Sequence, residues 1–320
     1  MKYPKISIII PLYVIEKRFF DDLKKFSVLN YPNYEILVVC DKKVELTGKN
    51  VRLILTRKKR TGPAEKRDIA IKAATGIYCA FIDDDAYPDK NWLKNAIHHF
   101  GHERIGAVGG PGLTPSEDGF WEQITGLIYQ SYFCGGPTQH RFKKAKINFV
   151  EDYPAYNLIV KKSVLKKIGG YGNHFYGGED TFLCLKIIKA GYHILYDPEV
   201  VVYHHRRPLF IPYLKQIANI GKHRGYFAKK FPETSMRFFY FMPSFAFLMF
   251  CLLIVGSLIN IHLLEIFITL LFGGIIVGMS SVIKKNNIGI SFLVSIGIIL
   301  THLVYGAYFL YGLTINDLKR

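Results

Sequence analysis

Short apolar runs alternate with amphipathic stretches through the first two-thirds of the chain. Each run ends at polar or turn-forming residues, which is typical of a buried strand, whereas the stretches between runs repeat apolar residues at helical spacing. The expected strands cover residues 5–10, 35–40, 51–55, 77–82, 105–108 and part of 195–203. The expected helices cover residues 16–29, 63–74, 89–100, 117–131, 161–168 and 180–190. This alternation predicts an α/β fold with a mostly parallel sheet flanked by helices.

The last third of the chain has a different pattern. Three apolar stretches, at residues 238–259, 262–283 and 288–312, are separated by short polar breaks. Each is long enough to cross a bilayer, and Glu265 is the only charged residue between positions 238 and 283. A buried helical core would carry more charge over such a length, so we expect C-terminal transmembrane helices.

Two other segments have weaker patterns. Residues 134–148 are rich in Gly, Pro and Lys, which favours a mobile loop that is either a lid or plain surface. Residues 208–233 mix aromatic and basic side chains. That mixture favours an interfacial segment that lies on the membrane surface before the first span.

The chain is strongly basic, with a net charge of +17 at pH 7, and most of this charge precedes the apolar stretches. A basic domain held at a membrane suits anionic lipids and phosphorylated ligands. We expect no nucleic-acid partner, because no zinc-finger or RNP signature occurs. The five cysteines are scattered without a CxxC pair, which favours the reducing, cytoplasmic side of the membrane. No signal peptide is expected, because the first apolar run is short and ends at Pro11.

Three consecutive carboxylates, Asp83, Asp84 and Asp85, follow the expected strand at 77–82. Burying unpaired carboxylates is costly, so such a group needs a cation, and its hard oxygen ligands suit Mg²⁺ or Mn²⁺. The alternative is a solvated turn that caps a helix. Asp41 follows another expected strand. Because ligands of open parallel sheets bind at the carboxyl ends of the strands, this agreement favours a site.

Two more motifs carry candidate chemistry. Gly177 and Gly178 let the backbone approach a ligand, and Glu179 and Asp180 open the next helix, where the helix dipole favours negative charge. These acids are either a helix cap or a general base. His204 follows the last expected strand and is either structural or a metal ligand.

In this order, the motifs resemble those of family 2 glycosyltransferases. The matching segments are Ile6–Tyr13, the strand that ends at Asp41, Gly62–Asp68, Phe81–Ala86 and Gly177–Asp180. The resemblance extends from about residue 4 to residue 207. It implies a GT-A fold and an inverting transfer of a sugar from a nucleotide-diphosphate sugar.

The resemblance also implies roles for single residues. Asp180 matches the base that deprotonates the acceptor hydroxyl, and Glu179 would support it. The acidic triad matches the DxD-type motif that holds Mg²⁺ or Mn²⁺ on the donor diphosphate, with Asp85 and Asp83 as the expected ligands and His204 near the same ion. The other expected donor-binding residues are Pro11, Tyr13, Asp41, Lys66, Arg67 and Asp84, together with Asp83 itself.

Departures from the family pattern restrict the function. The QxxRW motif of processive synthases is absent, since no Arg-Trp pair follows Gln216 at the required spacing, so a processive polymerase is not expected. The acids at 179–180 favour a hydroxyl on a lipid-linked or membrane-associated glycan as the acceptor. A polyprenyl-phosphate sugar synthase and a catalytically silent membrane scaffold stay open as alternatives. A P-loop ATPase is excluded, because the chain contains no GxxxxGK[ST] sequence.

These patterns divide the chain into three expected parts. Residues 1–207 form the GT-A catalytic domain, residues 208–234 the interfacial amphipathic segment and residues 235–320 a transmembrane region of about three helices. The expected partners are a nucleotide-diphosphate sugar donor, a lipid-linked or glycan acceptor and membrane lipids.

The expected location is the cell membrane, with several spans and the catalytic domain on the cytoplasmic face. Arg237 precedes the first span, and Lys284 and Lys285 follow the second, which suits the cytoplasmic side. Three spans would put Lys319 and Arg320 outside, against the same rule. The first two spans could instead form a shallow hairpin.

Overall fold

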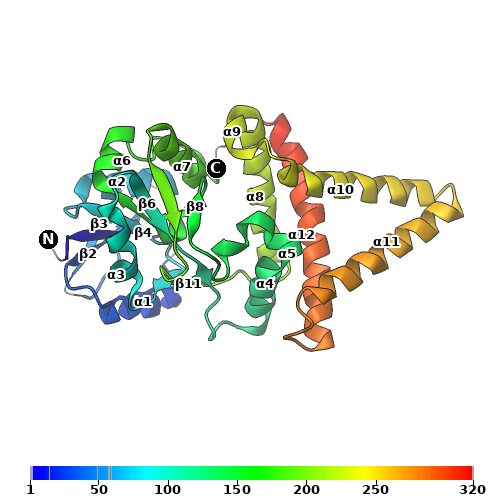
Figure 1. Ribbon diagram of the computed structural model, residues 1–320, viewed down its shortest axis with the longest axis horizontal. Coiled ribbons are helices and arrows are strands. Elements are labelled where there is room, and N and C mark those ends of the chain that lie inside the picture. Colours follow the sequence, from blue (N-terminus) through cyan, green and yellow to red (C-terminus); the bar gives the residue numbers. More distant parts are fainter. Residues whose placement is uncertain (1–2, 14, 49, 57, 59, 319–320) are drawn as a thin grey trace. The chain divides into compact units, whose positions relative to one another are not determined.

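An eight-stranded sheet organises the first two-thirds of the chain (Figure 1). Its strands are β1 Ile6–Pro11, β2 Tyr34–Cys40, β3 Val51–Leu55, β4 Tyr78–Phe81, β6 Ile105–Gly109, β8 Asn148–Val150, β9 Leu158–Lys161 and β10 His193–Tyr196. Their order across the sheet is β3-β2-β1-β4-β9-β6-β10-β8. β1, β2, β3 and β4 pair in parallel, as do β6 and β10, whereas β8 and β9 run antiparallel to their neighbours. The expected mostly parallel α/β sheet is therefore confirmed.

The structure is a computed structural model that describes residues 3–13, 15–48, 50–56, 58 and 60–318. The described residues form two compact units. The α/β unit contains the chain up to Pro115 together with Lys143–His205, and the helical unit contains Ser116–Phe142 and Arg206–Leu318. Residues 116–142 thus group with the C-terminal helices, although the sequence pattern assigned them to the first domain.

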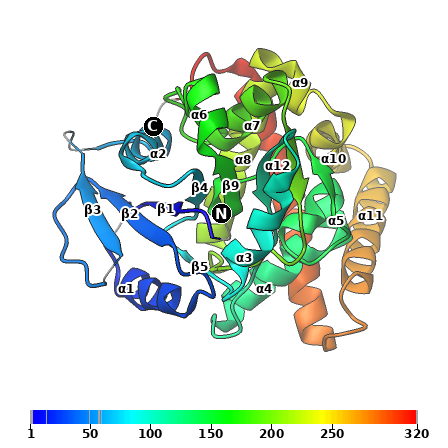
Figure 2. The same cartoon turned by 60° about the vertical axis from the view of Figure 1, so that its left-hand side comes forward.

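Helices cover both faces of the sheet because its strands are apolar on both sides. One face packs against α1 Lys17–Lys24, η1 Lys25–Val28, α3 Trp92–Ile97 and η2 His98–Gly101, and the other against α2 Pro63–Ala73, α6 Lys162–Ile168 and α7 Glu179–Lys189. Side chains alternate between these faces along β1: Ile8 and Ile10 join the first core, and Ile9 joins the second. Figure 2 shows α1 and α2 on opposite sides of β1, β2 and β3.

A second, three-stranded sheet lies beside the acidic triad in the α/β unit. It consists of β5 Ala86–Pro88, β7 Gly112–Leu113 and β11 Val202–His204. β11 pairs antiparallel with β5, so that His204 is the partner of Ala86, the residue after the triad. This pairing was not predicted, because strands of two or three residues leave no periodic pattern in a sequence.

Two further strand assignments also differ from the expectation. β9 was not predicted, because only the helix at 161–168 was expected there, and the single strand expected within 195–203 is two strands, β10 and β11, in different sheets. The backbone turns between them, with the N–H of Val200 bonded to the carbonyl of Asp197 at 3.2 Å.

The helical unit is built around α8 Ile211–Lys230 and α12 Ile288–Thr314. Its other helices are α4 Phe120–Gln130, α5 Tyr132–Gly135, η3 Gly136–Arg141, α9 Pro232–Ser235, α10 Phe238–Ser257 and α11 Ile261–Ser280, whereas the short helix η4 Ala155–Asn157 belongs to the α/β unit. Tyr213 and Ile217 of α8 are buried with Ile128 of α4 and Ile298 of α12. Most of the segment expected to lie on the membrane surface is therefore a helix whose apolar residues pack against other helices.

The first half of the segment at 134–148, expected as a mobile loop, is folded into α5 and η3. The hydroxyl of Ser131 accepts a hydrogen bond from the backbone N–H of Cys134 at 3.2 Å. The Gln139 side chain donates to the carbonyl of Gln130 at 2.6 Å, and the Thr138 hydroxyl donates to the carbonyl of Gly135 at 2.8 Å. These local side-chain to backbone bonds hold tight turns that the Gly- and Pro-rich composition does not reveal.

Three helices of the helical unit, α10, α11 and α12, are long and apolar enough to cross a membrane. α10 and α11 expose most of their surface, whereas a third of the apolar window of α12 is buried by protein. Within this unit, α10 and α11 form the two arms of a V, and each arm has one end beside α12 (Figure 1). The arms meet near Leu258 and Ile259, which are 84% and 87% exposed.

The two arms of the V contact opposite ends of α12. The ring of Phe241, near the start of α10, packs edge-to-face against that of Phe309, near the end of α12, with centroids 4.8 Å apart. Ser295, near the start of α12, donates a hydrogen bond to the carbonyl of Ile275, near the end of α11, at 2.8 Å. α10 therefore begins beside the C-terminal end of α12, and α11 ends beside its N-terminal end.

Candidate active site

The carboxyl ends of β1, β2 and β4 meet at one edge of the sheet, because these strands are parallel neighbours. Tyr13 follows β1, Asp41 follows β2 and the acidic triad follows β4. The backbone N–H of Tyr13 donates to the carboxylate of Asp84 at 2.7 Å. The middle carboxylate of the triad therefore fixes the chain after β1, which leaves Asp83 and Asp85 for other contacts.

Asp83, Asp85 and His204 form a cluster of potential metal ligands. One ligand atom from each of the three lies within 4.8 Å of the others. The ring nitrogen Nε2 of His204 is 3.0 Å from Oδ1 of Asp85, and the ring itself lies 4.7 Å from that of Tyr156. Two carboxylates and an imidazole suit Mn²⁺ well, and the carboxylates alone suit Mg²⁺, so these residues fit the expected divalent cation.

Arg67, on α2, joins this cluster to the second acidic motif. Its side chain is buried, and Nη2 donates to Oδ1 of Asp83 at 2.8 Å. Nη1 donates to Oε1 of Glu179 at 3.1 Å and to Oδ1 of Asp180 at 3.3 Å. One guanidinium thus holds carboxylates from two motifs that lie about a hundred residues apart in the sequence, as only a planar cation with several donors can.

Asp180 lies at the start of α7, after two glycines in the left-handed region. Gly177 has φ 89° and Gly178 has φ 82°, a conformation that other residues adopt only with strain. Oδ2 of Asp180 accepts a hydrogen bond from the N–H of Ala155 at 3.0 Å. Burial, followed by the nearby charge of Glu179, raises the pKa of Asp180 to about 8, although Arg67 opposes this shift.

Asp41 and Lys66 form a separate pair at the same edge. The buried ammonium of Lys66 lies 3.0 Å from Oδ2 of Asp41 and donates to the carbonyl of Leu12 at 2.8 Å. Asp41 also accepts hydrogen bonds from the Thr56 hydroxyl at 2.6 Å and from the Thr61 N–H at 3.3 Å. Burial alone would raise the pKa of Asp41, but these hydrogen bonds outweigh it and lower the pKa to about 2.

The structure therefore separates residues that the sequence treated alike. Lys66 and Arg67 are neighbours and were both expected near the donor, but Lys66 turns to Asp41, whereas Arg67 turns to the acidic motifs. Tyr13 lies with Lys66, whose ammonium is 5.2 Å from the centre of the tyrosine ring. Pro11 is buried in β1 beside Val39.

Two positioning residues were not singled out from the sequence. Asp68 accepts hydrogen bonds from the N–H groups of Tyr171 at 2.7 Å and Gly172 at 2.9 Å, which fixes the loop that leads to Asp180. The side chain of buried Asn157 donates to the carbonyls of Gly110 and Val200 at 2.6 and 2.7 Å. Asp68 stood within a recognised motif, but Asn157 had no sequence signal.

A family model described as Glycosyl transferase family 2 matches residues 7–169. The chain is a family 2 glycosyltransferase. As a member of this family it is an enzyme. The matched residues include Arg67, the acidic triad and the other motifs of the sheet edge that precede them in the chain.

Curated relatives of this glycosyltransferase include archaeal enzymes. Over 282 residues it is 26% identical to a Methanococcus voltae dolichyl N-acetyl-alpha-D-glucosaminyl phosphate 3-beta-D-2,3-diacetamido-2,3-dideoxy-beta-D-glucuronosyltransferase, covering 82% of this chain and 85% of the relative. It is also 26% identical over 237 residues to the glycosyltransferase AglE of Haloferax volcanii, covering 68% of this chain and 72% of the relative.

A solved structure supports the fold of the glycosyltransferase. The mannosyltransferase PcManGT of Pyrobaculum calidifontis, solved in complex with GDP-Man and Mn²⁺, aligns with a TM-score of 0.55 and 17% identity. The alignment covers 98% of this chain and 88% of that chain. The fold is GT-A, with three C-terminal helices apolar enough to span a membrane.

Proposed function

We propose that this enzyme transfers a sugar, with inversion of configuration, from a nucleotide-diphosphate sugar to a hydroxyl group of a lipid-linked glycan. The reaction depends on Mg²⁺ or Mn²⁺ and takes place on the cytoplasmic face of the cell membrane. The observation that carries the proposal is the contact of one guanidinium, that of Arg67, with both Asp83 and Asp180. It brings a cation-binding motif and a candidate base into one small volume.

Asp180 acts as the general base in this proposal. Its side chain keeps about a fifth of its surface exposed. Each carboxylate oxygen has two lone pairs, so each can accept a proton in addition to the hydrogen bond from Arg67 or Ala155. A single base that activates the acceptor for attack on the sugar face opposite the leaving group gives inversion. Glu179 supports Asp180 by sharing the same guanidinium.

The other end of the reaction is the departing nucleoside diphosphate, which gains negative charge as the glycosidic bond breaks. Asp83, Asp85 and His204 would hold the divalent cation, which when bound stabilises that charge electrostatically. Asp41, which follows β2, and Lys66, on α2, pair at the same edge of the sheet, where they would contact the nucleoside part of the donor. Asp84 and the backbone of Tyr13 keep these two parts of the edge together.

The acceptor and the location rest on other observations. Three apolar helices favour a membrane-bound acceptor, and the name of the Methanococcus voltae relative includes a dolichyl-linked sugar phosphate. The mannosyltransferase PcManGT, solved with GDP-Man and Mn²⁺, shares the fold, which supports a nucleotide-sugar donor and a divalent ion. The basic residues beside the apolar helices support the cytoplasmic orientation.

The proposal is tested with the full-length enzyme in nanodiscs, a panel of UDP- and GDP-sugars, and lipid extracts as acceptor. We expect a glycolipid product whose formation stops when EDTA removes the divalent ion and resumes with Mn²⁺. Asp85→Asn should lower transfer by about 100-fold or more, as expected for loss of a group that acts on transition-state charge. Asp21→Asn, at an exposed aspartate paired with Lys24, is the matched control and should keep full activity.

The acceptor assignment has its own comparison. Bare polyprenyl phosphate and polyprenyl-linked sugar are offered separately to the wild type and to Asp180→Asn. Transfer to the linked sugar that is lost in the variant supports a hydroxyl acceptor. Transfer to bare polyprenyl phosphate that survives in the variant would show a polyprenyl-phosphate sugar synthase instead, because an ionised phosphate needs no base. No transfer and no metal-dependent nucleotide binding would indicate a silent scaffold.

A further inference from the structure

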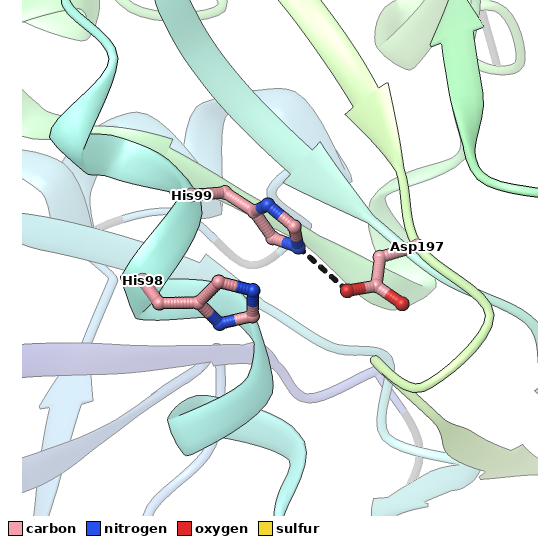
Figure 3. Close-up of side chains that lie close together, drawn as sticks. All are labelled: His98, His99 and Asp197. Carbon is pink, nitrogen blue, oxygen red and sulfur yellow. Dashed lines mark hydrogen bonds and ion pairs between the residues drawn. The ribbon is translucent and has the colours of Figure 1, made fainter.

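A second group of metal-type side chains lies in the α/β unit, separate from the residues described above. Its members are His98 and His99 of η2 and Asp197, which follows β10 (Figure 3). A ring nitrogen of each histidine and a carboxylate oxygen of Asp197 lie within 4.8 Å of one another. Figure 3 shows both imidazole rings turned toward the aspartate.

We propose that these three residues bind a divalent transition metal ion of the Zn²⁺ class. Two imidazoles and one carboxylate are ligands that Zn²⁺ accepts readily, whereas Mg²⁺ prefers oxygen alone. The group therefore selects a different ion from the one expected at Asp83 and Asp85. With three protein ligands, one position stays open for water.

The spacing is close to what such an ion needs. Nε2 of His99 and Oδ2 of Asp197 are 2.6 Å apart, joined by a hydrogen bond. Ligands of a tetrahedral zinc ion at about 2.1 Å lie about 3.4 Å from one another, so this pair must open by about 0.8 Å while the ion replaces the shared hydrogen. The two rings have their centroids 3.8 Å apart, and a nitrogen of each lies within 4.8 Å of the carboxylate, so both are near the position of one ion.

Asp197 is held as metal-binding carboxylates usually are. It is buried, and its other oxygen, Oδ1, accepts a hydrogen bond from the N–H of Glu199 at 2.8 Å. Its own N–H donates to the carbonyl of Gly109 at 2.9 Å, which anchors it to β6. Such outer contacts fix the orientation of a ligand and strengthen metal binding.

The ion would connect η2 to the turn between β10 and β11, and β11 carries His204. Its role is therefore to hold that turn in place, and it takes no part in the transfer reaction. Because the ion would bind the folded protein and not the unfolded chain, it would also make the folded state more stable.

The experiment uses full-length protein in nanodiscs, stripped with a chelator and then kept in excess Mg²⁺. Zn²⁺ is titrated calorimetrically, and Co²⁺ is used as a spectroscopic probe of tetrahedral nitrogen and oxygen ligands. All titrations are made in an Asp85→Asn background, which weakens binding at the other cluster. We expect one bound Zn²⁺ whose Kd rises by about tenfold or more in His98→Ala, since even outer contacts contribute that much.

His98 is exposed, so its replacement leaves the fold intact, and His102→Ala is the matched control at a nearby exposed histidine. The control should bind Zn²⁺ as the parent does. Zn²⁺ should also raise the Tm of the parent protein, which carries only Asp85→Asn, and that of the control. It should not raise the Tm of His98→Ala. The proposal would be overturned if His98→Ala showed the same zinc binding and the same Tm shift as the parent. It would also be overturned if the parent bound no Zn²⁺ in excess Mg²⁺.

Discussion

At the scale of single residues, the buried guanidinium of Arg67 decides how the acidic motifs are arranged. Its two terminal nitrogens hold Asp83 on one side and the pair Glu179 and Asp180 on the other. Removing the guanidinium altogether would leave these partly buried carboxylates without a neutralising charge, which is destabilising. A change that keeps the charge but alters the geometry is therefore the informative one.

Arg67→Lys should lower kcat by about 100-fold while KM for the donor changes much less. A lysine ammonium is compact and cannot contact both motifs at once, so the base moves relative to the donor, and a displacement of about 1 Å has an effect of this size. The measurement is steady-state transfer at saturating acceptor. Arg52→Lys, at an arginine that donates to the carbonyl of Ala73, is the control. Equal losses in both variants would contradict a positioning role.

The raised pKa of Asp180 predicts a pH dependence of transfer. The base must be ionised, so kcat/KM should rise with pH by about tenfold per unit below the pKa and level off above it. The value of about 8 arises without a bound cation, whose positive charge lowers the pKa, so the midpoint should lie below 8 in saturating Mn²⁺.

Glu179→Gln tests the cause of this shift. It removes the neighbouring negative charge that helps raise the pKa of Asp180, so the midpoint of the pH profile should move to lower pH. The profile is measured as kcat/KM between pH 5 and pH 9, with donor stability checked at each pH. A midpoint that stays in place or moves upward would mean that another group titrates.

At the scale of secondary-structure elements, the start of α7 depends on its glycines. Gly178 is the N-cap of the helix and lies in the left-handed region, with φ 82° and ψ 0°. Gly169 ends α6 in a similar conformation, with φ 75°, and a Cβ there would meet no neighbouring atom. The two positions share the same backbone requirement, but only the first leads directly into Glu179 and Asp180.

Gly178→Ala and Gly169→Ala should each reduce the free energy of unfolding by about 1–2 kcal/mol, the cost of a left-handed alanine. Only Gly178→Ala should also reduce kcat, because a strained N-cap displaces the acids that follow it. Thermal unfolding and transfer rates of the two variants are compared side by side. If Gly169→Ala loses kcat to the same degree, the loss reflects general destabilisation.

Much of the element pattern was predictable, and the exceptions have a physical cause. The strands before Pro11, Asp41 and Asp83 were predicted because buried parallel strands are continuous apolar runs. The short strands β5, β7 and β11 exist only through pairing between distant segments, so no local pattern encodes them. The same holds in the site: the acidic motifs were recognisable, but the contact of Arg67 with both of them, and the placement of Asn157, depend on tertiary structure.

At the scale of the whole molecule, the V of α10 and α11 changes the expected membrane topology. In three helices that cross in turn, the start of the first lies beside the start of the third. Here Phe241 of α10 lies beside Phe309, at the far end of α12. α10 begins beside one end of α12, and α11 ends beside the other end. Both open ends of the V therefore lie on the same side, next to α12.

We therefore expect α10 and α11 to cross as a hairpin and α12 to lie along the membrane surface. Each arm has 20 residues, about 30 Å at 1.5 Å per residue, which matches the hydrocarbon core. Lys284 and Lys285 then lie on the cytoplasmic side. This placement of Lys284 and Lys285 agrees with the positive-inside rule, whereas Lys319 and Arg320 lie outside the described residues.

The check is protease protection of tags at both termini in sealed inverted vesicles, with a third tag inserted between Leu258 and Ile259. The hairpin predicts that both terminal tags are cut and that only the inserted tag is protected. Protection of the C-terminal tag would instead indicate three successive crossings.

The pairing of β11 with β5 also bears on how the protein is made. Asp83 and Asp85 leave the ribosome early, but their partner His204 is reached only near the end of the α/β unit. The first apolar helix begins soon afterwards, at Phe238. At about 5–20 residues per second, the cluster of potential metal ligands is completed only a few seconds before the first apolar helix is made. In the membrane-bound enzyme proposed above, synthesis therefore leaves little time for a completed site to exist away from the membrane.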